Sequence, residues 1–506
     1  MSDNSKHDAA RRQFLRRGGA AAGVAAVAAA VPLQALASRA ITPGPLSGAN
    51  RLSRVAGRVD PAYGPLYPTF DATTGLPLLK LPKGFRYLTF GWAGDVLDSG
   101  APTPGGHDGM AAFDGPNGEV VLIRNHELTS GGSFGDAAIT YEQASGGGTT
   151  SLRFDPEAGA FLGSVPSIAG TVRNCAGGPT PWGSWLTCEE TLNGPEKGNA
   201  ELPHGYVFEV PVEGRAAPVP LKAMGRFYHE AVAVDPQSGI LYQTEDRGTA
   251  GFYRFIPNTP GRLVDGGTLQ MLAVAGDPQR DLRSGLEIND SFPVAWVTID
   301  DPDKPHSNPG APAGELDNLG VYRQGFDKGG AVFARLEGCW HGAGKIYFTA
   351  TSGGDSNLGQ VWEYDPARGV LRLVYESFSV ELLDSPDNLT VSPRGGLLLC
   401  EDGGYPCDLR GLTVDGEIFH FAENNVELWE QPRRLIQALQ ANGLPGGITD
   451  RAAFQLLEAL GTSAGDFRGR EFAGATYSPD GRWLFVNIQT PGITFAITGP
   501  WGLGKL

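Results

Sequence analysis

The sequence predicts an all-β chain folded as a six-bladed β-propeller, and three observations support this fold class. The chain of 506 residues contains 73 Gly and 38 Pro without a fibrous period, which is typical of many short strands joined by turns. A hairpin pattern recurs six times along the chain. A second, more exposed hairpin follows several of these copies, so that four strands, the content of one propeller blade, are repeated.

The first 37 residues predict an export signal rather than a folded element. Twin arginines in "RRQFLRR" (11–17) precede an Ala-rich apolar run at 18–36 and the small-residue cleavage site Ala35-Leu36-Ala37. The alternative, a membrane anchor, is disfavoured because the run is weakly hydrophobic and contains Pro32. We therefore expect the twin-arginine export machinery to be a partner, a periplasmic or secreted location, and no stable membrane span.

An N-terminal arm is predicted at 38–80, and the propeller at 81–506 with insertions at about 257–330 and 423–470. The second insertion contains "RAAFQLLEAL" (451–460), which has the apolar spacing of an amphipathic helix. The final blade shows only "TFAIT" (494–498) as an outer strand. We expect "GFRYLTFGW" (84–92) to supply its partner and so close the ring without open sheet edges.

Each copy of the repeat has a polar or acidic start, a β-rich strand, a turn, a second β-rich strand and, in most copies, an acidic end. Turns such as "DPQSG", "SPRGG" and "SPDG" are typical of tight hairpins. The copies occupy 107–127, 173–190, 225–246, 335–355, 385–403 and 472–492.

In a propeller, the two ends of every inner hairpin meet at one mouth of the central channel. Crowded carboxylates cannot all stay ionised in a partly dry site unless cations neutralise them. Any one of these acids alone could be a solvated turn residue, but the acids flank the inner strands and the strand interiors are almost free of charge, which favours bound metal. The collected ends are Asp108, Asn125, Glu127, Cys175, Glu189, Glu190, Glu230, Glu245, Asp246, Glu337, Asp355, Asp387, Asn388, Glu401 and Asp402.

The donor types suggest which metals bind. Oxygen ligands in this number suit calcium, which takes six to eight of them. Cys175 is either a small buried hydrophobic residue or a thiolate ligand, and in the second case the site also holds iron or another transition metal. The candidate metal ligands are Cys175, Glu189, Glu190, Glu230, Glu337, Glu127, Glu245, Asp387, Glu401 and Asp402.

Arg335 is the candidate catalytic residue. It stands two positions before Glu337, where it either balances the charge of the carboxylates or presents its planar fork to a bound anion. Neither a GxSxG motif nor a phosphate-binding loop is present.

Charge and cysteine content argue against two other classes of protein, those that bind nucleic acid and those held together by disulfide bonds. The formal net charge of −16, with no basic cluster beyond the N-terminus, argues against nucleic acid as a partner. Five cysteines spread over a long chain leave at least one thiol unpaired, which argues against a disulfide framework.

Several long motifs resemble the PhoX family of secreted alkaline phosphatases. These are the twin-arginine leader, "RNCAGGPTPWGSWLTCEET" (173–191), "GRFYHEAVAVDP" (225–236), "ARLEGCW" (334–340), "SPDNL" (385–389) and "CEDG" (400–403). The resemblance implies a six-bladed propeller whose mouth holds a pair of ferric ions and several calcium ions and hydrolyses phosphate monoesters. It also implies that Cys175 is the iron thiolate and that Glu190, Glu230 and Glu337 are metal carboxylates, with Arg335 holding the phosphate.

Two other function classes remain open at the level of sequence. A calcium-dependent lactonase or arylesterase propeller would also gather acids in the channel, but would not need Cys175 or iron. A non-catalytic propeller that binds a partner at its mouth would keep calcium for rigidity. The fold alone does not distinguish a phosphatase from a lactonase or arylesterase, or from a propeller that only binds a partner.

Overall fold

The six predicted hairpins all form, and each supplies the two innermost strands of one blade. The computed structural model describes residues 62–304, 320–428 and 465–506, which lie within one compact unit, Gly57–Leu506. These strands are buried along almost their whole length, because each blade packs between two neighbouring blades and both faces of its inner strands are covered.

The first three blades are built from consecutive strands. Blade 1 consists of β4 (His107–Asp114), β5 (Val120–His126), β6 (Gly147–Asp155) and β7 (Ala160–Thr171). Blade 2 consists of β8 (Asn174–Pro179), β9 (Ser184–Glu189) and β10 (Val207–Pro211). Blade 3 consists of β11 (His229–Val234), β12 (Leu241–Glu245), β13 (Phe252–Pro257) and β14 (Gly267–Val274).

The last three blades follow the same plan, with strands from the N-terminal part added to two of them. Blade 4 consists of β16 (Leu336–Gly342), β17 (Lys345–Ala350), β18 (Gln360–Asp365) and β19 (Val370–Glu376). Blade 5 consists of β20 (Pro386–Val391), β21 (Leu397–Glu401), β22 (Asp408–Leu412) and β23 (Ile418–Asn424). Blade 6 consists of β26 (Phe472–Tyr477), β27 (Leu484–Ile488), β28 (Ile493–Thr498) and β3 (Arg86–Phe90).

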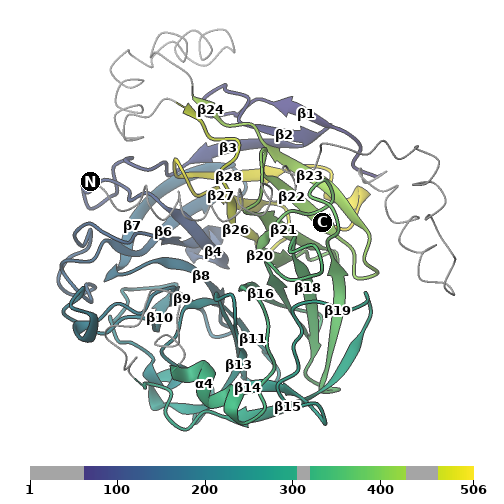
Figure 1. Cartoon of the computed structure of the whole chain (residues 1–506). Helices are drawn as coiled ribbons and strands as arrows, with labels where there is room; N and C mark the ends of the chain where they lie inside the picture. Colours follow the sequence, from purple (N-terminus) through teal and green to yellow (C-terminus); the bar gives the residue numbers. More distant parts are fainter. Residues whose placement is uncertain (1–61, 305–319, 429–464) are drawn as a thin grey trace, which may run out of the picture. The chain divides into compact units, whose positions relative to one another are not determined.

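The blades form a closed ring. Their innermost strands contact one another in the order β4, β8, β11, β16, β20 and β26, and β26 contacts β4 again (Figure 1). The predicted fold class, an all-β six-bladed propeller, is therefore confirmed.

The predicted closing strand is also confirmed. β3 pairs antiparallel with β28, with Thr494 opposite Phe90 and Thr498 opposite Arg86. Nearby, β2 (Leu79–Pro82) pairs with β23 of blade 5, and β1 (Leu66–Thr69) pairs with β2. The N-terminal part of the described chain thus joins two neighbouring blades.

One of the more exposed second hairpins, which the sequence predicts at 205–221, yields only β10 among the described residues. Residues 212–221 form no strand, and they include Pro218 and Pro220, which have no N–H to donate to a sheet. Region 257–330 contributes β14, α4 (Gly320–Asp327) and β15 (Ser291–Thr298), which pairs with both β14 and β19 and so links blades 3 and 4.

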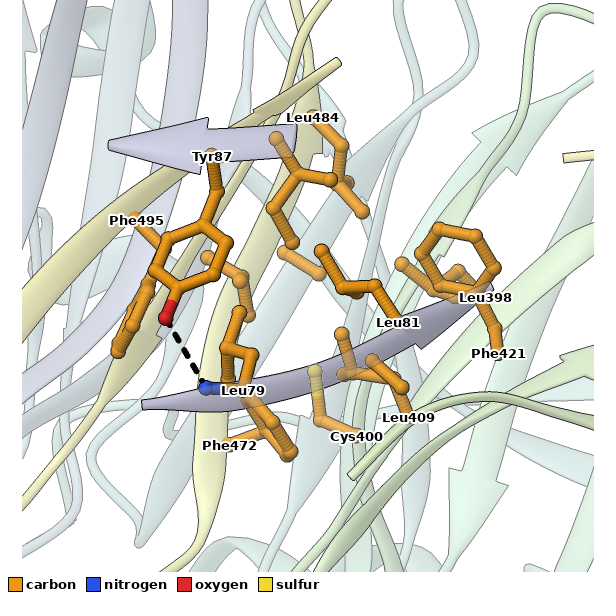
Figure 2. Packing of buried hydrophobic residues seen from close by; sticks show 14 of the residues in the cluster. Leu79, Leu81, Tyr87, Leu398, Cys400, Leu409, Phe421, Phe472, Leu484 and Phe495 are labelled. Carbon is orange, nitrogen blue, oxygen red and sulfur yellow. Dashed lines mark hydrogen bonds between the residues drawn. The ribbon is translucent and has the colours of Figure 1, made fainter. Parts of the chain in front are cut away.

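The hydrophobic core between blades 5 and 6 shows how the added strands are held (Figure 2). Leu79 and Leu81 of β2 are fully buried among side chains of both blades, and the Tyr87 hydroxyl accepts a hydrogen bond of 3.1 Å from the Leu79 N–H. The two-residue strands β24 (Glu427–Leu428) and β25 (Gly465–Asp466) pair with each other.

Some expectations lie outside the described residues. These are the export signal at 1–37, the arm up to residue 61 and the helix at 451–460. No helix in the described ranges has the length and apolar character needed to cross a membrane. All five cysteines are described, and each is buried as a free thiol.

Candidate active site at the channel mouth

Three positions of every inner hairpin lie at the channel mouth, and we name them by their place on the strands. The rim position precedes the first strand, the bulge position is the second residue of that strand, and the end position follows the second strand. In all six blades the end N–H donates a hydrogen bond of 2.8–3.2 Å to the rim carbonyl. This contact fixes the rim and end positions relative to each other.

The bulge position takes its name from an irregularity shared by all six blades. Each innermost strand shifts register close to its start, as between His229 and Val232 in blade 3. A bulge re-aims a side chain and is common next to active sites. The residues at this position in blades 1 to 6 are Asp108, Cys175, Glu230, Glu337, Asp387 and Ala473.

Four groups of possible ligands form from these positions. Within each group, the ligand atoms lie within 4.8 Å of one another. The groups are Cys175, Glu190 and Glu230; Glu230, Asp246 and Glu337; Asp387, Asp402 and Glu471; and Asp108, Glu127 and Glu471. Each group bridges two neighbouring blades, and the first two groups share Glu230.

The acids in these groups have strongly altered pKa values. Burial first, and then the neighbouring carboxylates, raise the pKa of Asp108, Glu230, Glu337 and Glu471. Burial, followed by the charge of Glu230, likewise raises the pKa of the Cys175 thiol. Such crowding of donors is unfavourable by itself and fits a site that holds cations, which would lower these pKa values again.

Seven of the ten predicted ligands belong to the groups, and three do not. Glu189, Glu245 and Glu401 are the last residues of their strands, so their side chains point away from the mouth while the next residue points into it. Each instead accepts hydrogen bonds from the protein.

Glu189 is part of a buried network behind the mouth. It accepts hydrogen bonds from the N–H groups of Val172 and Gly205 and contacts His204 Nδ1 at 2.6 Å, while Glu142 contacts the other ring nitrogen at 2.5 Å. Burial opposes charge on His204, but the two carboxylates outweigh it and raise its pKa to about 9. An imidazolium between two carboxylates therefore holds the end of blade 2.

Glu245 and Glu401 are held in comparable ways. Glu245 accepts hydrogen bonds from the Gly251 N–H at 3.0 Å and the Tyr253 hydroxyl at 2.7 Å. Glu401 accepts a hydrogen bond of 2.8 Å from Arg410 Nε and one of 3.0 Å from the Asp384 N–H.

Arg335 occupies the rim position of blade 4. Its Nε donates to Asp246 Oδ1 at 2.9 Å, and its other nitrogen contacts Glu337. Burial opposes its charge, but Asp246 and Glu337 raise its pKa. The guanidinium thus remains charged beside the group formed by Glu230, Asp246 and Glu337.

The sequence of the chain matches the alkaline phosphatase PhoX family over residues 62–162 and 150–492. This is most of the chain. The protein belongs to the PhoX family of alkaline phosphatases. As a family member it is a metal-dependent phosphatase that acts on small phosphate esters. No curated protein matches the sequence.

One solved structure agrees with the propeller fold. The chain is similar to "Pseudomonas fluorescens PhoX in complex with vanadate, a transition state analogue", with a TM-score of 0.56, 18% identity, and coverage of 86% of this chain and 97% of that one. A gluconolactonase from Xanthomonas campestris matches with a TM-score of 0.38 and 12% identity, over 88% of this chain and 100% of that one. The second similarity is too low to bear on the site of this PhoX-family protein.

Two residues at the mouth were missed by the sequence reasoning. Glu471 takes part in two groups, but it stands one position before the sixth hairpin as the sequence delimits it. Arg173, at the rim of blade 2, has the same spacing to Cys175 as Arg335 has to Glu337. Asp108 and Asp246 were recognised as strand ends but not as candidate ligands.

Proposed function

We propose that this phosphatase hydrolyses phosphate monoesters at a mixed iron and calcium centre in the channel mouth. The observation that carries the proposal is the pair of groups sharing Glu230, one with a thiol and one with oxygen donors only, beside the rim arginine Arg335. A thiolate with two carboxylates suits iron, and oxygen-only groups suit calcium.

The donor set fits these ions. In this proposal Cys175, Glu190 and Glu230 hold iron, and Glu230, Asp246 and Glu337 complete the adjoining site. The remaining two groups, which share Glu471, hold calcium. When bound, the metals supply the positive charge that neutralises phosphate oxygens and acidifies the attacking water.

The side chains of the protein orient the substrate. Arg335 presents two N–H donors in one plane, which match two oxygens of a phosphate group. Asp246 and Glu337 fix the direction of its guanidinium before substrate arrives. In the overall reaction, water adds to phosphorus, the ester P–O bond breaks, and the leaving alkoxide takes up a proton to give an alcohol.

Elemental analysis together with hydrolysis of an aryl phosphate tests the centre. We expect iron and calcium in the purified protein, loss of hydrolysis on chelation, and recovery when calcium is returned. Calcium without iron, and no phosphate hydrolysis, would instead favour the lactonase or the binding propeller.

Replacing Arg335 with Ala tests its role. We expect kcat/KM for an aryl phosphate to fall by about 100-fold or more, as for the loss of one donor to a developing anion, with metal content unchanged. Arg372→Ala is the matched control, because Arg372 pairs with Glu363 on the outer strands of the same blade. Equal activity in the Arg335 variant and the control would refute the assignment.

We further propose that the protein reaches the periplasm or the exterior through the twin-arginine machinery. The support is the sequence of the leader, with Arg11 and Arg12 before the Ala-rich run. Changing both arginines to Lys should retain the protein in the cytoplasm. Unchanged export in cell fractionation would contradict the proposal.

A further inference from the structure

We propose that Arg173 is a second phosphate-contacting residue, so that the substrate phosphate is held by two arginines on opposite sides of Glu230. The inference rests on the proposed phosphatase site and adds to it a residue that recognises the substrate. It follows from a correspondence between blades 2 and 4.

Arg173 and Arg335 occupy the same structural position. Both are rim residues with left-handed backbone, at φ 52° and 47°. The carbonyl of Arg173 accepts the Glu190 N–H at 2.9 Å, and that of Arg335 accepts the Thr351 N–H at 2.8 Å. Their own N–H groups donate to the carbonyl oxygens of Leu128 at 2.9 Å and of Arg247 at 2.7 Å, each the residue directly after the end position of the preceding blade.

The side chains also make corresponding contacts. Arg173 Nε donates to Glu127 at 3.1 Å, just as Arg335 Nε donates to Asp246, and both acceptors are end residues of the preceding blade. The Nη2 atom of Arg173 contacts Glu190, the end residue of its own blade, and that of Arg335 contacts Glu337, the bulge residue of its own blade. Each arginine is thus aimed at the mouth by two carboxylates.

The ligand groups place the two arginines around one centre. Glu190 lies with Cys175 and Glu230 in one group, and Glu337 lies with Glu230 in the next. An arginine therefore contacts a member of each of the two groups that share Glu230. A phosphate bound to the metals of the two groups that share Glu230 would lie between the two guanidinium groups.

Both arginines are accessible to a molecule that enters from solvent. The side chains of Arg173 and Arg335 remain 31% and 25% exposed. A left-handed backbone is also strained in residues with a Cβ, and such strain is common at ligand-binding positions. Both observations favour contact with a molecule that enters from solvent.

The decisive variant is Arg173→Gly, which removes the side chain and relieves the left-handed strain, so the protein should still fold. Asn117→Gly is the control for strain relief, because Asn117 has φ 58° in the turn between β4 and β5, at the other end of blade 1. Arg173→Lys keeps the charge but not the planar fork.

Three quantities are measured on each purified protein with its metals: metal content, the inhibition constant of inorganic phosphate, and the rise in Tm caused by phosphate. We expect Arg173→Gly to keep its metals, to bind phosphate about 10-fold or more weakly, and to lose most of the phosphate-induced rise in Tm. Arg173→Lys should recover only part of the loss, and Asn117→Gly should behave as wild type.

Two results would overturn the inference. The first is wild-type phosphate affinity in Arg173→Gly. The second is a loss of phosphate affinity that matches the loss of metal, because it would mean that Arg173 only orders Glu127 and Glu190. The rise in Tm requires no turnover. If the wild type fails to hydrolyse an aryl phosphate, the proposed function fails, while phosphate binding still tests Arg173 separately.

Discussion

Neighbouring acids at the end of one strand serve different purposes in this protein. Glu245 faces the outer strands and is hydrogen-bonded to Tyr253, whereas Asp246 faces the mouth and is paired with Arg335. Strand alternation produces this division, because successive side chains point to opposite faces. The same division separates Glu189 from Glu190.

Comparing two glutamates of one hairpin tests this division. We expect Glu230→Gln to lower the metal content, because Glu230 belongs to two ligand groups. Glu245→Gln should retain the metals, since burial raises the pKa of Glu245 to about 7 and the amide resembles its protonated form. Elemental analysis of both variants is the measurement, and equal metal loss from the two would contradict the division.

Individual residues also show where sequence reasoning stops. The repeat identified both members of pairs such as Glu401-Asp402, but strand alternation decides which one enters the mouth, and the outcome depends on where the second strand ends, which the sequence does not mark. Glu471 was missed because its place at the rim depends on where the first strand of the sixth hairpin, β26, begins. Arg173 was missed although the spacing "R-x-C" parallels the "R-x-E" of Arg335.

At the scale of elements, the closing strand β3 is held by more than its pairing with β28. Asp71 Oδ1 accepts the Thr89 N–H at 2.8 Å, and Oδ2 accepts the Thr89 and Thr74 hydroxyl groups at 2.6 Å and 2.5 Å. Asp71 is almost fully buried. This one carboxylate therefore fixes β3 to the segment that precedes it.

Asp71→Ala should destabilise the ring closure without altering the active site. Leaving the buried Thr89 N–H and the hydroxyl groups without an acceptor is expected to lower the free energy of unfolding by about 3 kcal/mol. Denaturant unfolding measures the loss, and the metal content should stay at the wild-type level. Thr69→Ala on the exposed strand β1 serves as a control with little effect. A stability equal to wild type would show that β3 does not depend on Asp71.

The prediction of elements succeeded where the repeat was explicit. All six inner hairpins and the closing strand follow from turn signals and alternating apolar residues, which are local properties. The pairing of β15 with both β14 and β19 was not predicted, because it joins segments that only the tertiary structure brings together.

At the scale of the whole molecule, the acidic mouth makes stability depend on both metal and pH. Asp108, Glu230, Glu337 and Glu471 have raised pKa values in the absence of cations, first because they are buried. For groups whose folded pKa is raised, the stabilisation is full below the unfolded pKa of about 4.5 and is lost as pH rises through the folded pKa. Bound cations remove this penalty.

We therefore expect the difference in Tm between the metal-loaded and the chelated protein to increase as pH is raised from 5 to 8. Each site saturated at 1,000 times its Kd contributes about 4 kcal/mol. Calorimetry with and without chelator at several pH values measures the difference, and calcium addition provides the reversal control. A difference that shrank with rising pH would mean that the crowded carboxylates are not the cation sites.

Ring closure also has a consequence for biosynthesis. Blade 6 is completed only when β3, near the start of the described chain, pairs with β28, near its end. A ribosome must release almost the whole chain before this pairing can occur, so the nascent protein holds β3 without its partner strand β28 through most of translation. A chain cut short before β28 would expose strand edges, which are the surfaces that promote aggregation. Blade 6, and with it the closed ring, can therefore be completed only when synthesis of the chain is almost finished.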